Sequence, residues 1–376
     1  MEQSLLDLSP LLHLLLMGAL VAMLPLCWVW LRNPNASTRQ RVQWLTWVTV
    51  FITFDLVMFG AFTRLTDSGL GCPDWPGCYG HASPLGAQAA IQEAQTQMPT
   101  GPVTHTKAWI EMIHRYMAMA VGGLILTLAS WAWVKRWRGD ARAGVMWPTI
   151  SLVWVCVQGA FGALTVTMKL FPLIVTLHLM GGLTLLCLLV VQAVRHSADN
   201  PVTMRAGLQR LTVLGLCLLA MQVALGGWVS TNYAVLACNT FPQCQNTWWP
   251  LMDFAQGFTL WRPLGLNAQG ESLSFEALTA IHYVHRLFAY VVFVYLGLLA
   301  WQILRIETLQ TAARLVLGLL LLQLLTGLSN VVLDWPLVAA VLHTGGAAAL
   351  SATLVWILSR THVATMSTPH TSGWST

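Results

Sequence analysis

Nine long apolar stretches run along this 376-residue chain, and they restrict its fold more than any other feature. A helix needs about 20 residues to cross the ~30 Å hydrocarbon core of a bilayer, and each stretch is long enough. Lipid offers no partners to backbone polar groups, so the spans have to be helices. Hydrophobic residues make up 56% of the sequence and charged residues 9%, whereas soluble domains carry about 25% charged residues. The sequence therefore predicts an all-α polytopic membrane protein, with helices at about 11–31, 44–62, 109–134, 145–167, 173–195, 208–230, 276–304, 312–333 and 336–359.

Basic residues gather in loops on one side of these helices, which the positive-inside rule makes the cytoplasmic side. They are Arg32, Arg39, Arg41, Lys135, Arg136, Arg138, Arg142, Arg195, Arg205, Arg210, Arg305, Arg314 and Arg360. The long loops 63–108 and 231–275 then lie outside and hold most of the acidic residues. The formal net charge of +5 reflects this topology and gives no reason to expect nucleic acid as a partner. We expect the N-terminus outside and the C-terminus in the cytoplasm.

The region from about 44 to 195 resembles the region from about 208 to 359. Each has four predicted helices with one long outer loop after the first, and several spacings recur. The matching pairs are Gly60–Cys72 with Gly226–Cys238, 12 residues apart, and Gln158–His178 with Gln323–His343, 20 residues apart. Because each half has an even number of spans, the halves share one orientation, as parallel repeats about an axis along the membrane normal.

The repeat divides the chain into four parts. They are an extra N-terminal helix with its cytoplasmic loop (1–43), two four-helix bundles (44–200 and 201–360), and a cytoplasmic tail expected to be disordered (361–376). The segment from Met1 to Pro10 has no basic residue, so the leading helix is predicted to be retained rather than cleaved as a signal or transit peptide. A bacterial plasma membrane is favoured over an organelle.

Four histidines take matching places on the outer side of helices in the two halves: His114 and His178, then His285 and His343. A single histidine of this kind could be a hydrogen-bonded packing residue, but polar groups inside the bilayer are costly and usually functional. At a rise of 1.5 Å per residue, all four would lie roughly 8–14 Å below the outer boundary. Two facing helices in each half can then ligate one haem iron, so we predict these four residues as axial ligands.

The neighbours of these histidines support a flat ligand. Gly181-Gly182 and Gly345-Gly346 follow two of them and would let a macrocycle approach the backbone. Arg115 and Arg286 each follow a histidine, so they are candidates to bind haem propionates, the alternative being that they reach to the interface. The remaining histidines are not predicted as ligands; they are His13, His81, His105, His196, His282, His362 and His370.

The repeat breaks at two acidic residues. When His114 is aligned with His285, Glu111 falls opposite His282, and it lies one helical turn from a predicted ligand on the same face. A carboxylate there can position a substrate, accept a proton or bind iron, whereas the alternative is an acid favoured by the helix dipole in the first turn. Asp55 aligns with the apolar Met221 and either pairs with an arginine or marks a proton path. The asymmetry suggests that one half reacts and the other serves it.

Two cysteine pairs with one spacing lie in the predicted outer loops, Cys72 with Cys78 and Cys238 with Cys244. The outer side is oxidising, so disulfides persist there. The pairs are either staples that hold a cap over the helix ends or redox-active pairs that relay electrons. A metal site is a weaker alternative, because no histidine lies at ligand spacing in these motifs.

These residues together resemble the heme A synthase family of bacterial and mitochondrial membranes. The resemblance covers about 44 to 359 and rests on the run from Gly60 to Cys78, on Glu111-Met-Ile-His114-Arg115, on His285-Arg286 and on His343. It implies an eight-helix core of two bundles, so the ninth helix is an addition that is a candidate for oligomer contacts. It also implies oxidation of the C8 methyl group of heme O to a formyl group through a hydroxymethyl intermediate, giving heme A for cytochrome c oxidase.

Carried over residue by residue, the resemblance implies that His114, His178 and Glu111 form the substrate site, with Glu111 catalytic. It implies that His285 and His343 hold haem b, that the outer cysteines pair as above, and that heme O synthase supplies the substrate. The electron donor is not indicated. The main alternative is a non-enzymatic dihaem b-type cytochrome that carries electrons from quinol and needs no Glu111. A haem carrier without chemistry is a third.

Overall fold

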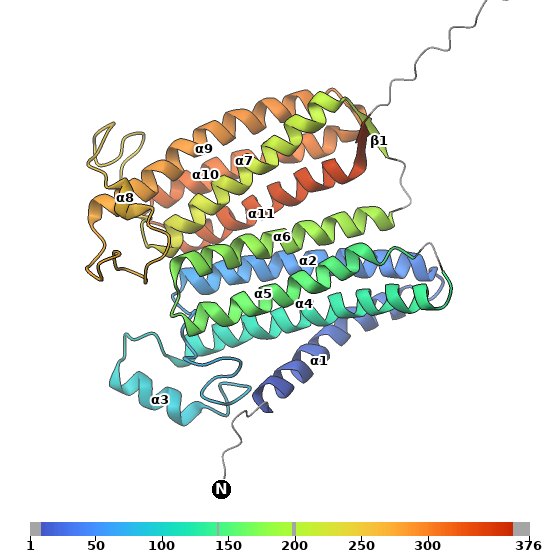
Figure 1. Ribbon diagram of the computed structural model, residues 1–376, viewed down its shortest axis with the longest axis horizontal. Helices are drawn as coiled ribbons and strands as arrows, with labels where there is room; N and C mark the ends of the chain where they lie inside the picture. The colour runs from blue at the N-terminus through green and yellow to red at the C-terminus, as the bar shows by residue number, and fades with distance from the viewer. Residues whose placement is uncertain (1–8, 141–142, 198–200, 364–376) are drawn as a thin grey trace, which may run out of the picture.

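The computed structural model describes residues 9–140, 143–197 and 201–363. Within them, nine helices are long and apolar enough to cross a membrane, which confirms the all-α multi-pass fold (Figure 1). They are α1 (Ser9–Arg32), α2 (Thr38–Leu65), α4 (His105–Trp137), α5 (Met146–Thr167), α6 (Pro172–His196), α7 (Ala206–Thr231), α9 (Phe275–Ile303), α10 (Gln310–Val332) and α11 (Leu337–Arg360). Their ends agree with the predicted spans to within a few residues at most places.

The start of α4 differs from the prediction, because local capping extends the helix beyond its apolar stretch. The side chain of Thr104 accepts a hydrogen bond from the backbone N–H of Lys107, so α4 begins at His105 rather than near 109. Glu111 therefore lies in the second turn of the helix, and no acid occupies the first. Stabilisation by the helix dipole, which is confined to the first turn, no longer explains this carboxylate.

The short elements lie at the two ends of the bundle. The outer loops contain α3 (Gln88–Gln97) and α8 (Phe254–Gly257), and the 3-10 turn η1 (Glu307–Leu309) precedes α10. At the opposite end β1 (Val202–Met204) pairs in parallel with β2 (Thr361–Val363). The start of the predicted tail thus forms a strand, while 364–376, with His370, and Arg142 lie outside the described residues.

The long helices form two four-helix bundles that lie side by side (Figure 1). In the first, α2, α4, α5 and α6 each pack against two neighbours in a ring, so that α4 and α6 stand on a diagonal. In the second, α7, α9, α10 and α11 form the same ring, with α9 and α11 diagonal. The bundles meet where α11 contacts α2 and α6 and where α6 contacts α7. Helix α1 packs outside the first bundle against α4 and α2. Domain boundaries at 43, 200 and 360 stay predictions.

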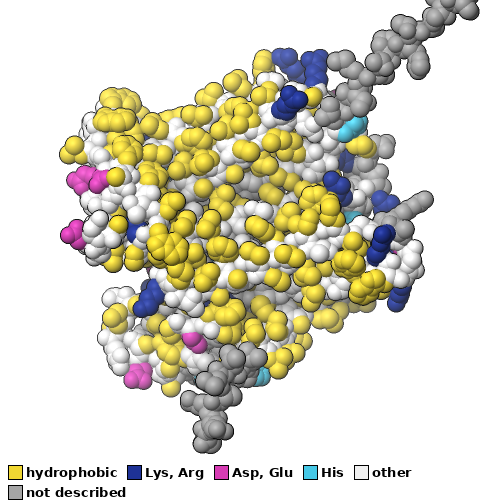
Figure 2. All heavy atoms as spheres, in the orientation of Figure 1, with side chains coloured by type: hydrophobic (Ala, Val, Ile, Leu, Met, Phe, Trp, Pro, Cys, Tyr) yellow, Lys and Arg dark blue, Asp and Glu magenta, His cyan; other side chains and the backbone are white. Residues whose placement is uncertain are grey.

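Charge is distributed unequally between the two ends of the molecule. Figure 2 shows most of the lysine and arginine side chains at the end where β1 lies, and the acidic ones at the end with α3 and α8. This is the distribution expected of a membrane protein whose basic end faces the cytoplasm.

Candidate functional site

The structure brings the predicted histidines together in pairs across the core of each bundle. His114 of α4 and His178 of α6 stand on the diagonal of the first ring and are close enough to interact electrostatically. His285 of α9 and His343 of α11 do the same in the second. His178 and His343 both lie six residues past the first residue of their helices, Pro172 and Leu337. All four side chains are half-buried. Two imidazoles from diagonal helices of one bundle, close enough to interact, are the donor set expected of a haem with two axial histidines.

A glycine on the adjacent helix lies against each of the four imidazole rings. A Cβ atom built on Gly60 would lie 3.0 Å from Nε2 of His114, and one on Gly226 would lie 2.9 Å from Cε1 of His285. The other two are Gly162, at 3.5 Å from Cε1 of His178, and Gly327, at 3.2 Å from Cε1 of His343. These glycines set the room available to the rings. Sequence reasoning used Gly60 and Gly226 only as markers of the repeat.

The glycines predicted to admit a macrocycle have a different role. A Cβ atom on Gly181 would meet the side chain of Gln158, and one on Gly346 would meet Gln323. In the second half the Gln323 side chain also donates to the carbonyl of His343 at 2.8 Å. The space beside Gly181 and Gly346 is therefore filled by two glutamines at equivalent places in the repeat, and these two glycines do not offer open backbone to a macrocycle.

The Nδ1 atoms of the second histidine pair both have polar partners that sequence reasoning missed. Thr326 Oγ1 lies 2.9 Å from Nδ1 of His343. Gln222 Nε2 lies 3.1 Å from Nδ1 of His285 and donates to its carbonyl at 3.2 Å. Such contacts fix the orientation of an imidazole ring.

Among the described residues, no such hydrogen-bond partner is found for the first histidine pair. The positions equivalent to Gln222 and Thr326 are Leu56 and Phe161, since the repeat offsets are 166 and 165 residues. Nδ1 of His178 is buried without a hydrogen-bond partner among the described residues. The ring of His114 stacks nearly parallel to Phe59, with 6.4 Å between the centroids.

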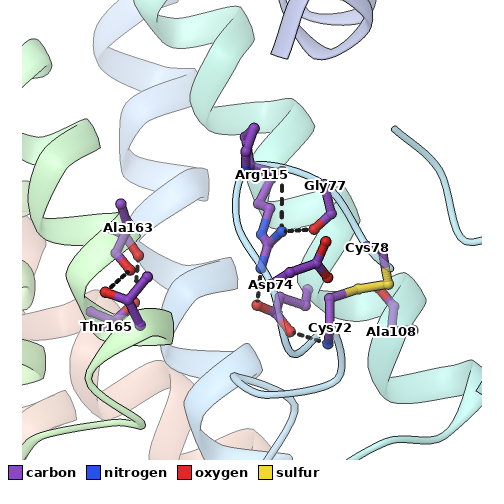
Figure 3. A network of polar contacts seen from close by, with 12 residues as sticks. Cys72, Asp74, Gly77, Cys78, Ala108, Arg115, Ala163 and Thr165 are labelled. Carbon is purple, nitrogen blue, oxygen red and sulfur yellow. Dashed lines mark hydrogen bonds and ion pairs between the residues drawn. A yellow bond between two sulfur atoms is a disulfide. The ribbon is translucent and has the colours of Figure 1, made fainter. Parts of the chain in front are cut away.

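Glu111 points to the outer loop that carries the first cysteine pair. Its side chain is buried, and Oε2 accepts a hydrogen bond from the backbone N–H of Cys72 at 2.8 Å. Oε1 forms an ion pair with Arg115 at 2.5 Å. Arg115 also donates to the carbonyls of Pro76 and Gly77, as Figure 3 shows for Gly77. The carboxylate thus connects the helix that carries His114 to the outer loop.

The second half repeats this arrangement with a neutral side chain. Nδ1 of His282 accepts from the backbone N–H of Cys238 at 3.4 Å. Arg286 is buried and donates to the carbonyls of Cys238, Thr240 and Gln243 at 2.8 to 3.0 Å. Arg115 and Arg286 therefore both hold loop backbone, and their contact with haem propionates stays a prediction.

The four outer cysteines form two disulfides, Cys72–Cys78 and Cys238–Cys244, and all four are buried. Leu14 of the extra helix and Ile91 of α3 pack in the same apolar cluster as the first disulfide. The extra helix thus contributes to the cap over the first bundle, a role that the sequence did not indicate.

Asp55 is half-buried and has neither a hydrogen bond nor an ion pair in the described part of the chain, so the arginine partner considered for it is not found. His81 pairs with Cys78 through the backbone, and His105 lies 3.2 Å from Gln92. His13 and His362 are exposed.

A polar cluster joins the two bundles at their outer ends. The Tyr233 hydroxyl donates to Asp67 at 2.7 Å, and the Arg64 guanidinium lies 4.1 Å from the Tyr233 ring centroid. Arg64 also donates to the carbonyl of Ser230 at 2.5 Å. Burial raises the pKa of Tyr233; the positive charge of Arg64 opposes this, and the hydrogen bond to Asp67 reinforces it.

Comparisons with known proteins match most of the chain. Residues 43–355 match a family model described as cytochrome oxidase assembly protein, and the match leaves α1 outside. A protein of Shewanella oneidensis named Heme A synthase is 38% identical over 320 residues, which cover 84% of this chain and 96% of that protein. Heme A synthases of Sinorhizobium medicae and Rhizorhabdus wittichii are 29% and 25% identical, over 84% and 86% of this chain and 89% and 94% of those proteins.

Proposed function

This chain belongs to the heme A synthase family, and we propose that it oxidises the C8 methyl group of heme O to a formyl group through a hydroxymethyl intermediate. Membership makes it a membrane oxidoreductase that acts on haem. The observation that carries the specific reaction is the pair of diagonal histidines in each bundle, together with the differences between the two sites. A plain dihaem cytochrome would need neither these differences nor a carboxylate beside His114.

We assign the two sites different occupants. His114 and His178 hold the substrate heme O, and His285 and His343 hold haem b. The four imidazoles suit these ligands, because each is half-buried and lies beside a glycine that leaves room for the imidazole ring. A haem b in the second bundle would supply one-electron redox chemistry to the first.

Glu111 is our candidate for the residue that handles protons at the substrate site. It lies one turn from His114 on α4, and its carboxylate is buried and kept in place by Cys72 and Arg115. A positioned carboxylate is a common general base. Both oxygens of Glu111 already have hydrogen-bond or ion-pair partners, so this residue can anchor the outer loop as well as transfer protons. Mutations have to separate these two roles.

The family also suggests the setting of the reaction. We propose a bacterial plasma membrane with the N-terminus outside, heme O synthase as the supplier, and delivery of heme A to cytochrome c oxidase. The electron donor is unassigned, and α1 is the candidate for contacts between copies. The buried sulfurs of both disulfides favour staples over redox-active pairs.

The test is co-expression with a heme O synthase in a host that lacks heme A, followed by extraction of the haems and identification by chromatography and mass. The wild-type chain should yield the formyl-haem mass, and His114→Ala and His178→Ala should abolish it. Normal heme A in either variant would refute the site assignment. Heme B bound with heme O untouched in the wild type would favour the dihaem cytochrome.

A further inference from the structure

The contacts of Thr326 favour one of the two neutral forms of His343, the one with its proton on Nδ1. The hydroxyl lies 2.7 Å from the carbonyl of Leu322 and 2.9 Å from Nδ1 of His343. A hydroxyl has one proton and two lone pairs, so a proton donated to the carbonyl leaves the oxygen to accept from Nδ1–H. Nε2 of His343 then keeps its lone pair, which is the form that binds iron.

Gln222 can serve His285 in the same way. Its Nε2 faces Nδ1 of His285, while its Oε1 is buried and has no partner within the described residues. The two ends of an amide exchange places when the group turns by half a circle, and such assignments follow from the hydrogen-bond network. With iron on Nε2 of His285, the turned amide would accept the proton of Nδ1 in place of its present hydrogen bond to the carbonyl of His285.

We propose that Gln222 and Thr326 are positioning residues that hold His285 and His343 as permanent axial ligands of the haem in the second bundle. The inference rests on the proposed function, which places that haem there. Leu56 and Phe161 occupy the equivalent places in the first bundle, so the pair that takes up and releases substrate lacks this support. A hydrogen-bonded Nδ1–H makes the imidazole a stronger donor, and its loss typically weakens metal binding about 10- to 100-fold.

The experiment uses the purified full-length protein with its haem. Thr326→Val removes the hydroxyl at nearly constant volume, and Thr326→Ser restores it. Thr353→Val is the matched control, because the Thr353 hydroxyl in the same helix α11 as His343 donates only to the carbonyl of Ala349, at 2.7 Å. Gln222→Leu removes the polar partner of His285 and introduces the residue type found at the equivalent place, Leu56, in the first bundle. It is the second test variant if Thr326→Val does not fold. The readouts are the haem b midpoint potential, the low-spin electron paramagnetic resonance spectrum, and haem retained against an apoprotein acceptor.

Thr326→Val should lose haem at least about tenfold more readily. If the tenfold weaker binding affects only the ferric haem, the midpoint potential of haem b rises by about 59 mV. The potentials of Thr326→Ser and Thr353→Val should stay close to that of the wild type. Unchanged potential and retention in Thr326→Val and Gln222→Leu would overturn the inference, as would an equal shift in Thr353→Val. His343→Ala separates the two claims: if it keeps the haem and its spectrum, the ligand assignment itself fails. If it loses the haem while Thr326→Val behaves as wild type, only the positioning role fails.

Discussion

In the C-terminal bundle a hydroxyl and an amide meet the Nδ1 atoms of the two histidines, whereas in the N-terminal bundle a phenylalanine and a leucine stand at those places. The scaffold around them is the same, since each ring lies on a bundle diagonal and against a glycine. The two halves thus share the same geometry around the histidines but differ in the hydrogen-bond partners of the Nδ1 atoms. We infer that a fixed ligand pair suits a resident cofactor and a less supported pair suits a substrate that has to leave.

The outer loops differ at one equivalent residue. Glu111 and His282 both accept the backbone N–H of the first cysteine in their loop, and an arginine one turn later binds loop carbonyls in both halves. Only the first half places a carboxylate there. The neutral His282 shows that anchoring the outer loop needs no charge. The negative charge of Glu111 is therefore the feature that distinguishes the first half.

Outside the histidine pairs, the largest effect is expected from removing that charge. Glu111→Gln keeps an oxygen that accepts from Cys72, but it cannot take up a proton as a carboxylate does. Loss of general base catalysis costs about 10²- to 10⁴-fold, so heme A formed per milligram of protein should fall by that factor with haem b content unchanged. His282→Gln is the matched variant of the second half and should have little effect. Normal heme A from Glu111→Gln would leave this residue as a loop anchor only.

Alanine at the glycines should affect each half separately. A Cβ on Gly226 would come within 2.9 Å of His285, which is too close, so the ring has to move by some tenths of an ångström. Gly226→Ala should therefore alter the low-spin spectrum of haem b, and Gly60→Ala should lower heme A formation roughly tenfold while leaving that spectrum unchanged. Gly162→Ala, at an ordinary 3.5 Å contact, is the control. A changed haem b spectrum in Gly60→Ala would show that the halves do not act separately.

The smallest effect is expected at the junction of the bundles. Tyr233→Phe removes the hydrogen bond to Asp67, which is worth at most about 1 kcal/mol because the tyrosine, although partly covered, is still 42% exposed to solvent. Because the folded pKa of Tyr233 is raised, its contribution to stability is present below the unfolded value of about 10 and is lost as the pH rises through the folded value. Thermal unfolding scans of both proteins should show a difference at pH 8 that shrinks at higher pH. A constant difference would contradict the role of this tyrosine.

Much of this architecture follows from the sequence because it depends on hydrophobic length and repeat spacing. The nine spans, the histidine pairs and the disulfides are of that kind. The start of α4 was missed because Thr104 caps a polar turn outside the apolar run. The direction of Glu111 was missed because it depends on the path of a loop 39 residues earlier in the chain.

Gln222 and Thr326 were also missed, although a signal was present. Each is polar where the other half is apolar, which is the same break in the repeat that drew attention to Glu111. A comparison of every polar residue in the spans across the two halves would have found them. Their partners lie 63 and 17 residues away, so only the packed helices show what they contact.

The most direct test of the account is the haem composition of two double variants, purified after co-expression with heme O synthase. His114→Ala with His178→Ala should keep heme B and lose bound heme O, while His285→Ala with His343→Ala should lose heme B. The wild type should hold heme B together with heme O or its product heme A. If the two double variants lost the same haem to the same extent, the claim that the bundles hold different haems for different purposes would be contradicted.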